Sequence, residues 1–340
     1  MLINPRFQQA YQIMQNSARV LILGHLRPDG DALSAVCALG LIVANLGKEV
    51  SLFCQDKNHT LFDYLPGFTD ILADKADLLR LTSAGSLKNN FDLIIVADCG
   101  SLARTGLVEE ILAFKKQGGL IIEFDHHPQI DNYADLELRQ PELSSTAELV
   151  YNFITSNRIV LTRELADCIL TGILTDTGNF LYPSASDATM QAASAAMEAG
   201  AHYAKIVNYT LRNKDVAMIK LWGLALERLY LNARYQVAIS VLTRADIVNS
   251  LDTANMDNAA ESDLLSGLAG FLSNLAGAKA VALLYEDRNG VVKGSLRSTP
   301  DGFLVSDLAR ALGGGGHERA AGFALPGRLE QRGVNWVVIN

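Results

Sequence analysis

Histidine and aspartate side chains recur at three places in the first half of the chain, each at the end of a short apolar run. These places are segment 25–31 (HLRPDGD), Asp98 and segment 125–127 (DHH), and a further acid, Asp176, lies in segment 174–178 (LTDTG). Imidazole and carboxylate groups together are suited to a divalent ion such as Mn²⁺. The chain has no CxxC pair of the kind that binds zinc.

The positions of these groups depend on the elements around them. The apolar runs 19–25, 50–54, 92–98 and 119–125 alternate with helical segments such as 32–46 and 105–116. This pattern predicts a mostly parallel sheet that is covered by helices on both faces. Ligands of such sheets bind beyond the carboxyl ends of the strands. We therefore expect the acidic and histidine groups to converge on one crevice.

Each motif also has a simpler interpretation when it is taken alone. An Asp-x-Asp loop can cap a helix, a His-His pair can be an ordinary surface feature, and an acid at a strand end can be merely solvated. Their joint position at strand ends favours a metal site, because carboxylates held close together repel one another without a cation.

The number of acids is enough for two divalent ions about 3.5–4 Å apart, bridged by a carboxylate and a water. Such a pair generates hydroxide at neutral pH and clamps a phosphoryl group for in-line displacement. Mn²⁺ is the favoured ion, with Mg²⁺ and Co²⁺ as alternatives, since Mg²⁺ keeps more of its waters.

Composition limits the kind of partner. The 340 residues are 49% hydrophobic and 19% charged, which is enough for two globular domains and excludes a disordered chain. The formal net charge of −8 argues against binding to long or duplex nucleic acid, because that binding depends on many Lys and Arg contacts to phosphates. A small anionic substrate remains compatible if metal ions supply positive charge.

The cysteines and the apolar stretches indicate a cytoplasmic protein. Cys37, Cys54, Cys99 and Cys168 lie far apart in the sequence and are expected to be reduced thiols in the core. The N-terminus does not resemble a signal peptide, and the longest apolar stretch, 32–46, is too short to span a bilayer. We expect no membrane association.

The second half of the chain has a different pattern. Helical segments 187–200 and 204–229 precede a smaller region with strands at 236–243, 278–286 and 291–297 and helices at 261–275 and 303–312. The turn 287–290 (DRNG) predicts a hairpin between the last two strands. We expect a first domain at 1–186, a helical connector at 187–232 and a second domain at 233–340.

Taken together, the motifs resemble those of the DHH phosphoesterases. Segment 25–32 (HLRPDGDA), Asp98, segment 125–127 and segment 175–178 (TDTG) are similar to the four motifs of this family, in order. Segment 313–322 (GGGGHERAAG) resembles the signature of the accompanying DHHA1 domain. The resemblance implies an α/β fold with a larger, mostly parallel-sheet DHH domain, a smaller α/β DHHA1 domain and an active site in the cleft between them.

The resemblance also implies roles for individual residues. The implied metal ligands are His25 and Asp29 for one ion, Asp31, His126 and Asp176 for the other, and Asp98 as the bridge. His127 would lie near the substrate phosphate as a proton donor or electrostatic stabiliser, and would form the catalytic set with Asp98 and His126. Asp125 would orient a histidine from behind.

Substrate contacts are implied mainly in the second domain. The implied contacts are Arg297, Ser298, Gly314, Gly315, Gly316 and His317, together with Arg104 of the first domain. Arg297 and Arg104 could instead be ordinary solvated side chains. Phe180 and Tyr182 could stack on a base or pack in the core.

One segment has a structural explanation, and two other features depart from the family pattern. Segment 145–148 (STAE) is typical of a capping box that opens a helix over 147–154. Leu181 stands where many relatives have a basic residue, and the tail after Phe323 matches nothing in the family; its apolar run would form a final strand or a subunit contact.

We expect no additional nucleic-acid-binding domain and no membrane spans, and the second domain lacks the Lys/Arg-rich signature of the pyrophosphatases. The chain is thus similar to the stand-alone oligoribonuclease (nanoRNase)/pAp phosphatase group. This resemblance implies a metal-dependent enzyme that hydrolyses RNAs of a few nucleotides to mononucleotides and pAp to AMP. The alternatives are a pyrophosphatase or exopolyphosphatase of the same family and a non-catalytic nucleotide-binding module. The oligomeric state stays open, with a homodimer as one option.

Overall fold

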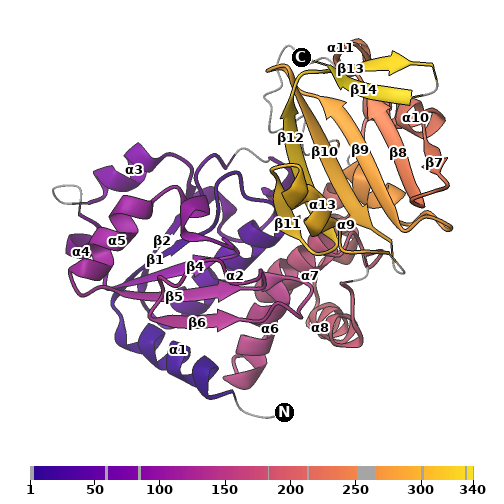
Figure 1. Cartoon of the computed structure of the whole chain (residues 1–340). Coiled ribbons are helices and arrows are strands. Elements are labelled where there is room, and N and C mark those ends of the chain that lie inside the picture. Colours follow the sequence, from indigo (N-terminus) through magenta and orange to yellow (C-terminus); the bar gives the residue numbers. More distant parts are fainter. Residues whose placement is uncertain are drawn as a thin grey trace. The chain divides into compact units, whose positions relative to one another are not determined.

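The computed structural model describes residues 4–57, 60–82, 86–182, 184–212, 214–250, 265, 267–299, 302–333 and 335–339. The chain forms two compact units, each with its own sheet (Figure 1). The first unit comprises Met1–Phe180 and Ser184–Arg212, and the second comprises Leu181–Pro183 and Asn213–Asn340.

The first unit is built on a six-stranded sheet of order β3-β2-β1-β4-β5-β6, and all neighbouring strands are parallel. Its strands are β1 (Arg19–Leu23), β2 (Glu49–Phe53), β3 (Ile71–Leu72), β4 (Leu93–Ala97), β5 (Leu120–Asp125) and β6 (Leu136–Arg139). The predicted parallel sheet is confirmed. The sequence reading did not predict β3 and β6, because β3 is only two residues long and β6 alternates buried and half-buried residues at the sheet edge.

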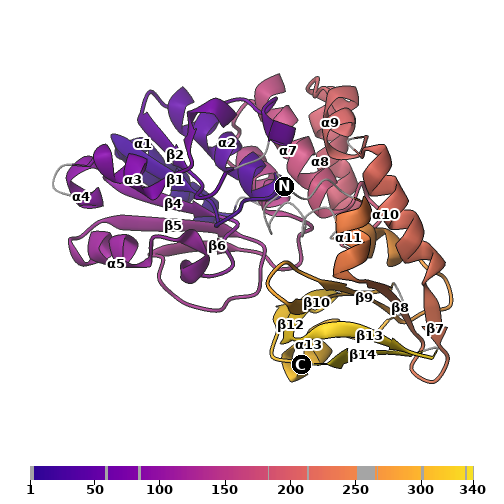
Figure 2. The ribbon, with the colours of Figure 1, turned by 90° about the horizontal axis from the view of Figure 1, so that it is seen from above.

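Helices cover both faces of this sheet. They are α1 (Pro5–Asn16), α2 (Gly30–Asn45), α3 (Lys75–Arg80), α4 (Leu87–Asn90), α5 (Val108–Lys116), α6 (Thr146–Ser156), α7 (Arg163–Asp176), α8 (Asp187–Glu198), α9 (Tyr203–Thr210) and the 3₁₀ turns η1 (Thr60–Phe62), η2 (Phe68–Asp70) and η4 (Leu102–Thr105). One apolar core joins α1, α2 and α6 to α9 to one face, and a second core joins α3, α4 and α5 to the other. Figure 2 shows α2 and α5 on opposite sides of the sheet.

The strand order creates a reversal in the middle of the sheet. The chain runs outward from β1 to β2 and β3, and it then returns to place β4 on the other side of β1. The loops that leave β1 and β4 therefore run in opposite directions, and open α/β sheets bind their ligands at such a reversal, beyond the carboxyl ends of the strands.

Two glycines let α7 approach α2 and α6 closely. A Cβ on Gly172 would lie 2.4 Å from the Cβ of Ala147 and 2.6 Å from Oδ1 of Asp31. A Cβ on Gly30 would lie 2.5 Å from Cγ2 of Thr175. Larger residues cannot occupy these positions without separating the helices, so the glycines bring the end of α7 to the N-terminus of α2.

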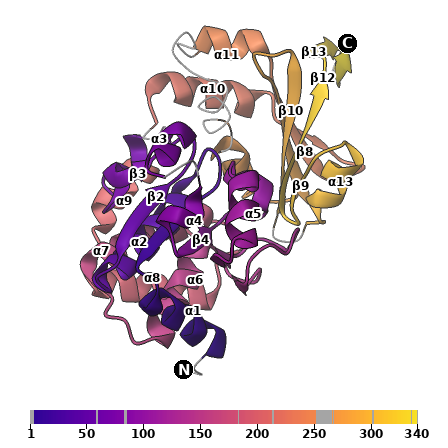
Figure 3. The same cartoon turned by 90° about the vertical axis from the view of Figure 1, so that its left-hand side faces the viewer.

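The second unit contains a mixed six-stranded sheet of order β11-β12-β10-β9-β8-β7, in which β8 and β9 are parallel and the other pairs are antiparallel. Its elements are α10 (Val216–Glu227), β7 (Tyr230–Asn232), β8 (Val237–Leu242), α11 (Arg244–Ser250), β9 (Ala280–Glu286), β10 (Val291–Ser298), α13 (Val305–Ala311), β11 (Gly315–His317) and β12 (Ala320–Pro326), followed by the hairpin β13 (Arg328–Arg332) and β14 (Asn335–Ile339). Helices α10 and α11 pack on one face, and α13 packs on the other (Figure 3).

Several predictions for this region can be compared with the structure. The hairpin at 287–290 is confirmed, since Asp287 accepts hydrogen bonds from the backbone N–H groups of Asn289 and Val291. The predicted single helix over 204–229 is wrong, because α9 ends at Thr210 and α10 begins at Val216. Within the predicted helix 261–275, residues 267–272 are helical, and residues 261–264 and 266 lie outside the described part of the chain.

The predicted reduced cysteines are confirmed, because all four are free and buried. The described helices are all too short or too polar to cross a membrane. The apolar C-terminal run forms β14, which pairs with β13, in agreement with the expectation of a final strand.

Candidate metal centre

Register alone brings three of the motifs to the same level of the sheet. Leu23 of β1 pairs with Val96 of β4, and Val96 pairs with Glu123 of β5. The residues two positions further along these strands are His25, Asp98 and Asp125. Because the strands are parallel, all three side chains emerge at the carboxyl edge of the sheet, next to the reversal between β1 and β4.

The first group of donor atoms contains His25, Asp29 and Asp98. Nε2 of His25 lies 3.8 Å from Oδ2 of Asp29 and 3.8 Å from Oδ2 of Asp98. Nδ1 of the same ring lies 2.8 Å from the carbonyl oxygen of Leu26. A carbonyl only accepts, so Nδ1 carries the proton and the lone pair of Nε2 faces the carboxylates.

The second group contains Asp31, His126 and Asp176. Nε2 of His126 lies 4.0 Å from Oδ2 of Asp31 and 3.5 Å from Oδ2 of Asp176. Nδ1 of His126 faces the carbonyl of Leu143 at 3.3 Å, which again directs Nε2 toward the acids. The sequence of segment 174–178 is that of a loop leaving a helix, but Asp176 is the last residue of α7 itself.

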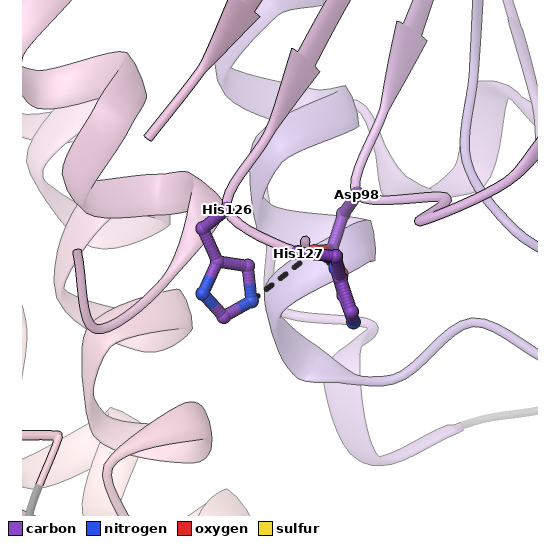
Figure 4. Close-up of side chains that lie close together, drawn as sticks. All are labelled: Asp98, His126 and His127. Carbon is purple, nitrogen blue, oxygen red and sulfur yellow. Dashed lines mark ion pairs between the residues drawn. The ribbon is translucent and has the colours of Figure 1, made fainter. Parts of the chain in front are cut away.

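Asp98 lies between the two groups. Its Oδ2 faces His25, and its Oδ1 lies 3.6 Å from Nε2 of His126. Figure 4 shows this ion pair with His126. The backbone of Asp98 has φ +60°, a left-handed conformation that aspartate tolerates better than bulkier residues do. Burial raises the pKa of Asp98 well above its usual value, and the charges of Asp31 and Asp29 raise it further.

The donor set fits divalent cations. Nε2 of His25 is buried and has no hydrogen-bond partner among the described residues, which is the environment expected of a metal ligand. Burial raises the pKa of Asp31 to about 6, and the nearby charge of Asp29 also disfavours its ionised form. Bound cations would stabilise these carboxylates in their charged form. The donor atoms of each group lie within 4.8 Å of one another.

The N-terminus of α6 holds two of these carboxylates. Oδ2 and Oδ1 of Asp31 accept hydrogen bonds from the backbone N–H groups of Thr146 (2.7 Å) and Ala147 (2.9 Å). The hydroxyl of Thr146 donates to Oδ1 of Asp98 at 2.8 Å. The helix dipole and these N–H groups favour negative charge at this position. The sequence interpretation of segment 145–148 favoured helix capping over a role near the site, and it did not assign Thr146 to Asp98.

The predicted capping box at this helix is only half confirmed. Ser145 is the N-cap, and its hydroxyl accepts from the backbone N–H of Glu148 at 3.0 Å. The Glu148 side chain does not return to the N-cap. It accepts instead from the backbone N–H and hydroxyl of Ser144 and from the hydroxyl of Thr189 in α8. Glu148 therefore ties the start of α6 to α8.

Asp125 and His127 form a second polar unit beside the metal ligands. Oδ1 of Asp125 accepts from the backbone N–H of His127 at 2.7 Å and from its Nδ1 at 2.8 Å, and Oδ2 accepts from the N–H of Gly100 at 2.5 Å. Burial opposes ionisation of Asp125, but the bonds from His127 outweigh it and lower the pKa to about 2. Asp125 thus fixes the ring orientation of His127.

Arg104 lies next to this unit, in η4. Its guanidinium NH1 and Cγ of His127 are each 3.4 Å from the point that a Cβ on Gly100 would occupy. The carbonyl of Arg104 accepts from the N–H of Leu26, which ties η4 to the loop that carries the first motif. No described residue hydrogen-bonds the guanidinium, and its positive charge favours the ionised form of Asp29.

The predicted substrate contacts of the second unit lie at two strands that flank β12. Arg297 and Ser298 end β10, Gly315 to His317 form β11, and both strands pair with β12. Gly316 has φ +136°, and a Cβ there would lie 2.7 Å from the carbonyl oxygen of Ala320, so this position requires glycine. Gly314 precedes β11.

The two candidate base-stacking residues, Phe180 and Tyr182, have different surroundings. Phe180 is half-buried and packs against the main core of the first unit. The hydroxyl of Tyr182 lies beside Gly270 of the second unit, 2.0 Å from where a Cβ on that glycine would be. For Phe180 the structure favours the packing interpretation.

The chain contains both domains of the DHH family. Residues 19–173 match the DHH family, N-terminal domain, and residues 234–333 match the DHHA1 domain.

Curated relatives extend over most of the chain. The bifunctional oligoribonuclease and PAP phosphatase NrnA of Bacillus subtilis is 25% identical over 309 residues, which is 90% of this chain and 89% of that protein. The protein of the same name from Thermus thermophilus is 27% identical over 311 residues, covering 91% of this chain and 84% of that protein.

Solved structures share the fold. An exopolyphosphatase-related protein from Bacteroides fragilis matches with a TM-score of 0.80 at 23% identity, covering 95% of this chain and 91% of that one. RecJ in complex with Mn²⁺ from Thermus thermophilus matches with a TM-score of 0.50 at 15% identity, covering 95% of this chain and 53% of that one.

Proposed function

We propose that this protein is a metal-dependent hydrolase that degrades oligoribonucleotides of a few nucleotides to mononucleotides and dephosphorylates pAp to AMP. The observation that carries the proposal is the pair of donor groups at the switch point of the parallel sheet, in which Asp98 of the first group also lies 3.6 Å from His126 of the second. The NrnA relatives, which cover about 90% of this chain, support the substrate class.

Two divalent ions are proposed as cofactors, with Mn²⁺ favoured over Mg²⁺ and Co²⁺. His25 and Asp29 would hold one ion, and Asp31, His126 and Asp176 the other, with Asp98 between them. When bound, the ions supply an activated water and neutralise phosphate charge. The mixed imidazole and carboxylate donors favour Mn²⁺, and the RecJ structure with Mn²⁺ is consistent with this choice.

The side chains around the donors have distinct tasks in this proposal. His127, whose Nδ1 is bound to Asp125, would present Nε2 to the phosphate. As an imidazolium it would either donate the Nε2 proton to the leaving oxygen or stabilise the negative charge there. Arg104 binds a phosphate oxygen beside it. In the second unit, Arg297, Ser298, His317 and the backbone of 314–316 bind a further phosphate.

The net charge of −8 fits a short substrate better than a long one. Four of the acids are metal ligands in this proposal, and two bound divalent ions would offset their charge at the place where a phosphate must bind. With those four acids set aside, the formal net charge is still −4, which does not favour a long polymer. We further propose a cytoplasmic location, which the four free cysteines support.

A substrate panel tests the function. The purified protein is incubated with Mn²⁺ and, separately, with a labelled diribonucleotide, a long single-stranded RNA, pAp, pyrophosphate and polyphosphate. We expect the diribonucleotide and pAp to be hydrolysed fastest. Faster cleavage of the long RNA would reject the short-substrate proposal. Preference for pyrophosphate or polyphosphate would indicate a pyrophosphatase or exopolyphosphatase of the same family. No hydrolysis of any substrate, with retained nucleotide binding, would indicate a binding module.

A further inference from the structure

A buried ionic network lies directly behind the Asp125–His127 unit. Glu123 and Asp125 are two residues apart on β5, so their side chains point to the same face of the sheet, and both are 0% exposed. Arg139 of β6 pairs in register with Asp125. Its side chain is 7% exposed, with NH2 2.8 Å from Oε2 of Glu123 and NH1 3.6 Å from Oδ2 of Asp125.

The same guanidinium also contacts the backbone of the catalytic segment. NH1 of Arg139 donates to the carbonyl oxygen of His127 at 2.7 Å. It therefore meets the Asp125–His127 unit at two points, the carboxylate and the carbonyl, while Asp125 holds the imidazole of His127 through Nδ1. The guanidinium is fixed in turn by Glu123, whose Oε1 accepts from the hydroxyl of Tyr133 at 2.7 Å.

Stability alone does not account for this network. Burying two carboxylates and one guanidinium carries a large desolvation penalty, and well-packed apolar residues at such positions are often equally stable or more stable. The surrounding face of the sheet is apolar, with Ile94, Val96 and Ile121 in the same core as Tyr133. The specific effect of the network is to define the position of one carboxylate and one carbonyl, both of which belong to the His127 segment.

We propose that Arg139 is a positioning residue for His127. It holds the Asp125 carboxylate and the His127 backbone so that the imidazole keeps a single orientation toward the reacting phosphate, and Glu123 holds Arg139. The proposal rests on the proposed function of His127. Arg139 itself is not proposed to touch substrate or metal.

The decisive variant removes the whole ion pair. Arg139→Met alone would leave Glu123 buried without its cation, and it could fail to fold for that reason. In Glu123→Gln/Arg139→Met, Tyr133 keeps its hydrogen-bond acceptor, and the charge that remains in the network is that of Asp125, which keeps its N–H donors from Gly100 and His127. We expect this double variant to melt close to the wild type and to bind Mn²⁺ with unchanged affinity. Its kcat should fall about tenfold or more, with KM within about twofold.

Two comparisons complete the kinetic test. Glu123→Gln alone retains the Arg139 contacts to Asp125 and His127, so its kcat should stay within about twofold of the wild type. Lys75→Met removes another ion pair of the first unit, that of Lys75 with Glu110 at 2.7 Å, and should change neither kcat nor KM. The proposal is overturned if the folded double variant has wild-type kcat, because the network is then purely structural.

A second measurement does not depend on turnover. In ¹⁵N-histidine-labelled protein at constant pH, the Nδ1–H proton of His127, assigned by its loss in His127→Gln, should give a hydrogen-bonded resonance. We expect this resonance to shift or broaden in the double variant, and an unchanged resonance would contradict the positioning role. If the wild type hydrolyses none of the panel substrates, the proposed function fails while this measurement still decides the role of Arg139.

Discussion

The hydroxyl of Thr146 donates a hydrogen bond to Oδ1 of Asp98 at 2.8 Å, which links the start of α6 to the end of β4. The neighbouring N–H groups of the same helix bind Asp31. One helix terminus therefore orients a carboxylate from each of the two donor groups. This relationship explains how several acids are kept together at a buried site, and it gives the first prediction.

Removing the Thr146 hydroxyl should weaken the metal centre. Thr146→Val keeps the shape of the side chain and the backbone N–H that binds Asp31, but it leaves Asp98 without this donor. We expect Mn²⁺ affinity or kcat to fall about 10- to 100-fold, as is typical when the partner of a metal ligand is lost. Titration calorimetry and kinetics measure both. Thr155→Val, on the same helix, removes only a bond to the carbonyl of Asn152 and should have no such effect.

Asp98→Asn should separate activity from stability. Losing the shared carboxylate should remove several kcal/mol of transition-state stabilisation, a decrease in kcat of about 10³-fold or more. The metal-free variant should nevertheless melt higher than the metal-free wild type at neutral pH, because a buried charge among other acids is gone. The control is Asp92→Asn at the opposite end of β4, where Asp92 accepts from the N–H groups of Ala18 and Arg19. It should retain activity, and a lower melting temperature for metal-free Asp98→Asn would contradict the electrostatic account.

Metal-free protein should become more stable on mild acidification. Burial raises the pKa of Asp31 to about 6 and that of Asp98 well above its usual value. Burial lowers the pKa of His126, but Asp176 and Asp31 outweigh it, and the net pKa is raised. All three groups bind protons more tightly in the folded chain than in the unfolded chain, so stability must increase as pH falls through these pKa values.

Calorimetry in the presence of a chelator tests this prediction. As the pH is lowered from about 7.5 to about 5.5, proton uptake by these groups should raise the melting temperature of the metal-free protein. The rise should be smaller in Asp98→Asn. With saturating Mn²⁺ the trend should reverse, because metal binding requires deprotonated ligands. Identical pH profiles with and without metal would rule out these residues as the binding site.

Arg104→Ala should affect substrate binding more than fold. A hydrogen bond between charged groups contributes about 1.5–3 kcal/mol, so KM for pAp should rise about 10- to 100-fold if Arg104 binds a phosphate. The control is Arg80→Ala, whose side chain is 77% exposed and pairs only with Asp77 among the described residues. Steady-state kinetics with pAp distinguish the two variants. An unchanged KM in Arg104→Ala would show that the guanidinium does not bind the substrate phosphate.

Gly172→Ala should damage the site through packing. Alanine normally stabilises a helix interior by about 1 kcal/mol relative to glycine. At Gly172, however, the new Cβ would lie 2.4 Å from Ala147 and 2.6 Å from Asp31, so α7 must move and carry Asp176 with it. We expect a lower melting temperature and weaker Mn²⁺ binding. Gly223→Ala in α10, where nothing lies within 4 Å of the new Cβ, should be stabilising. Equal effects at the two positions would contradict the packing argument.

The periodicity of apolar residues was sufficient to predict the parallel sheet and most of its helices. Continuous runs such as those at β1, β4 and β5 indicate strands buried on both faces. The edge strands β3 and β6 were missed because they are short or only half-buried. The residue types and their position after strands were enough to nominate the donor atoms of the candidate site. The sequence contained that information because ligand chemistry and strand ends are local properties.

Other features were decided only by tertiary structure. The link from Thr146 to Asp98 and the Arg139 contacts to Glu123 and His127 join segments that are remote or unremarkable in sequence. The register of parallel strands determines which side chains share a level, and the close approach at Gly172 determines where α7 ends relative to Asp31. Local patterns specify what a side chain can bind. Non-local hydrogen bonds and packing distances specify how it is held, and these exist only once the chain has folded.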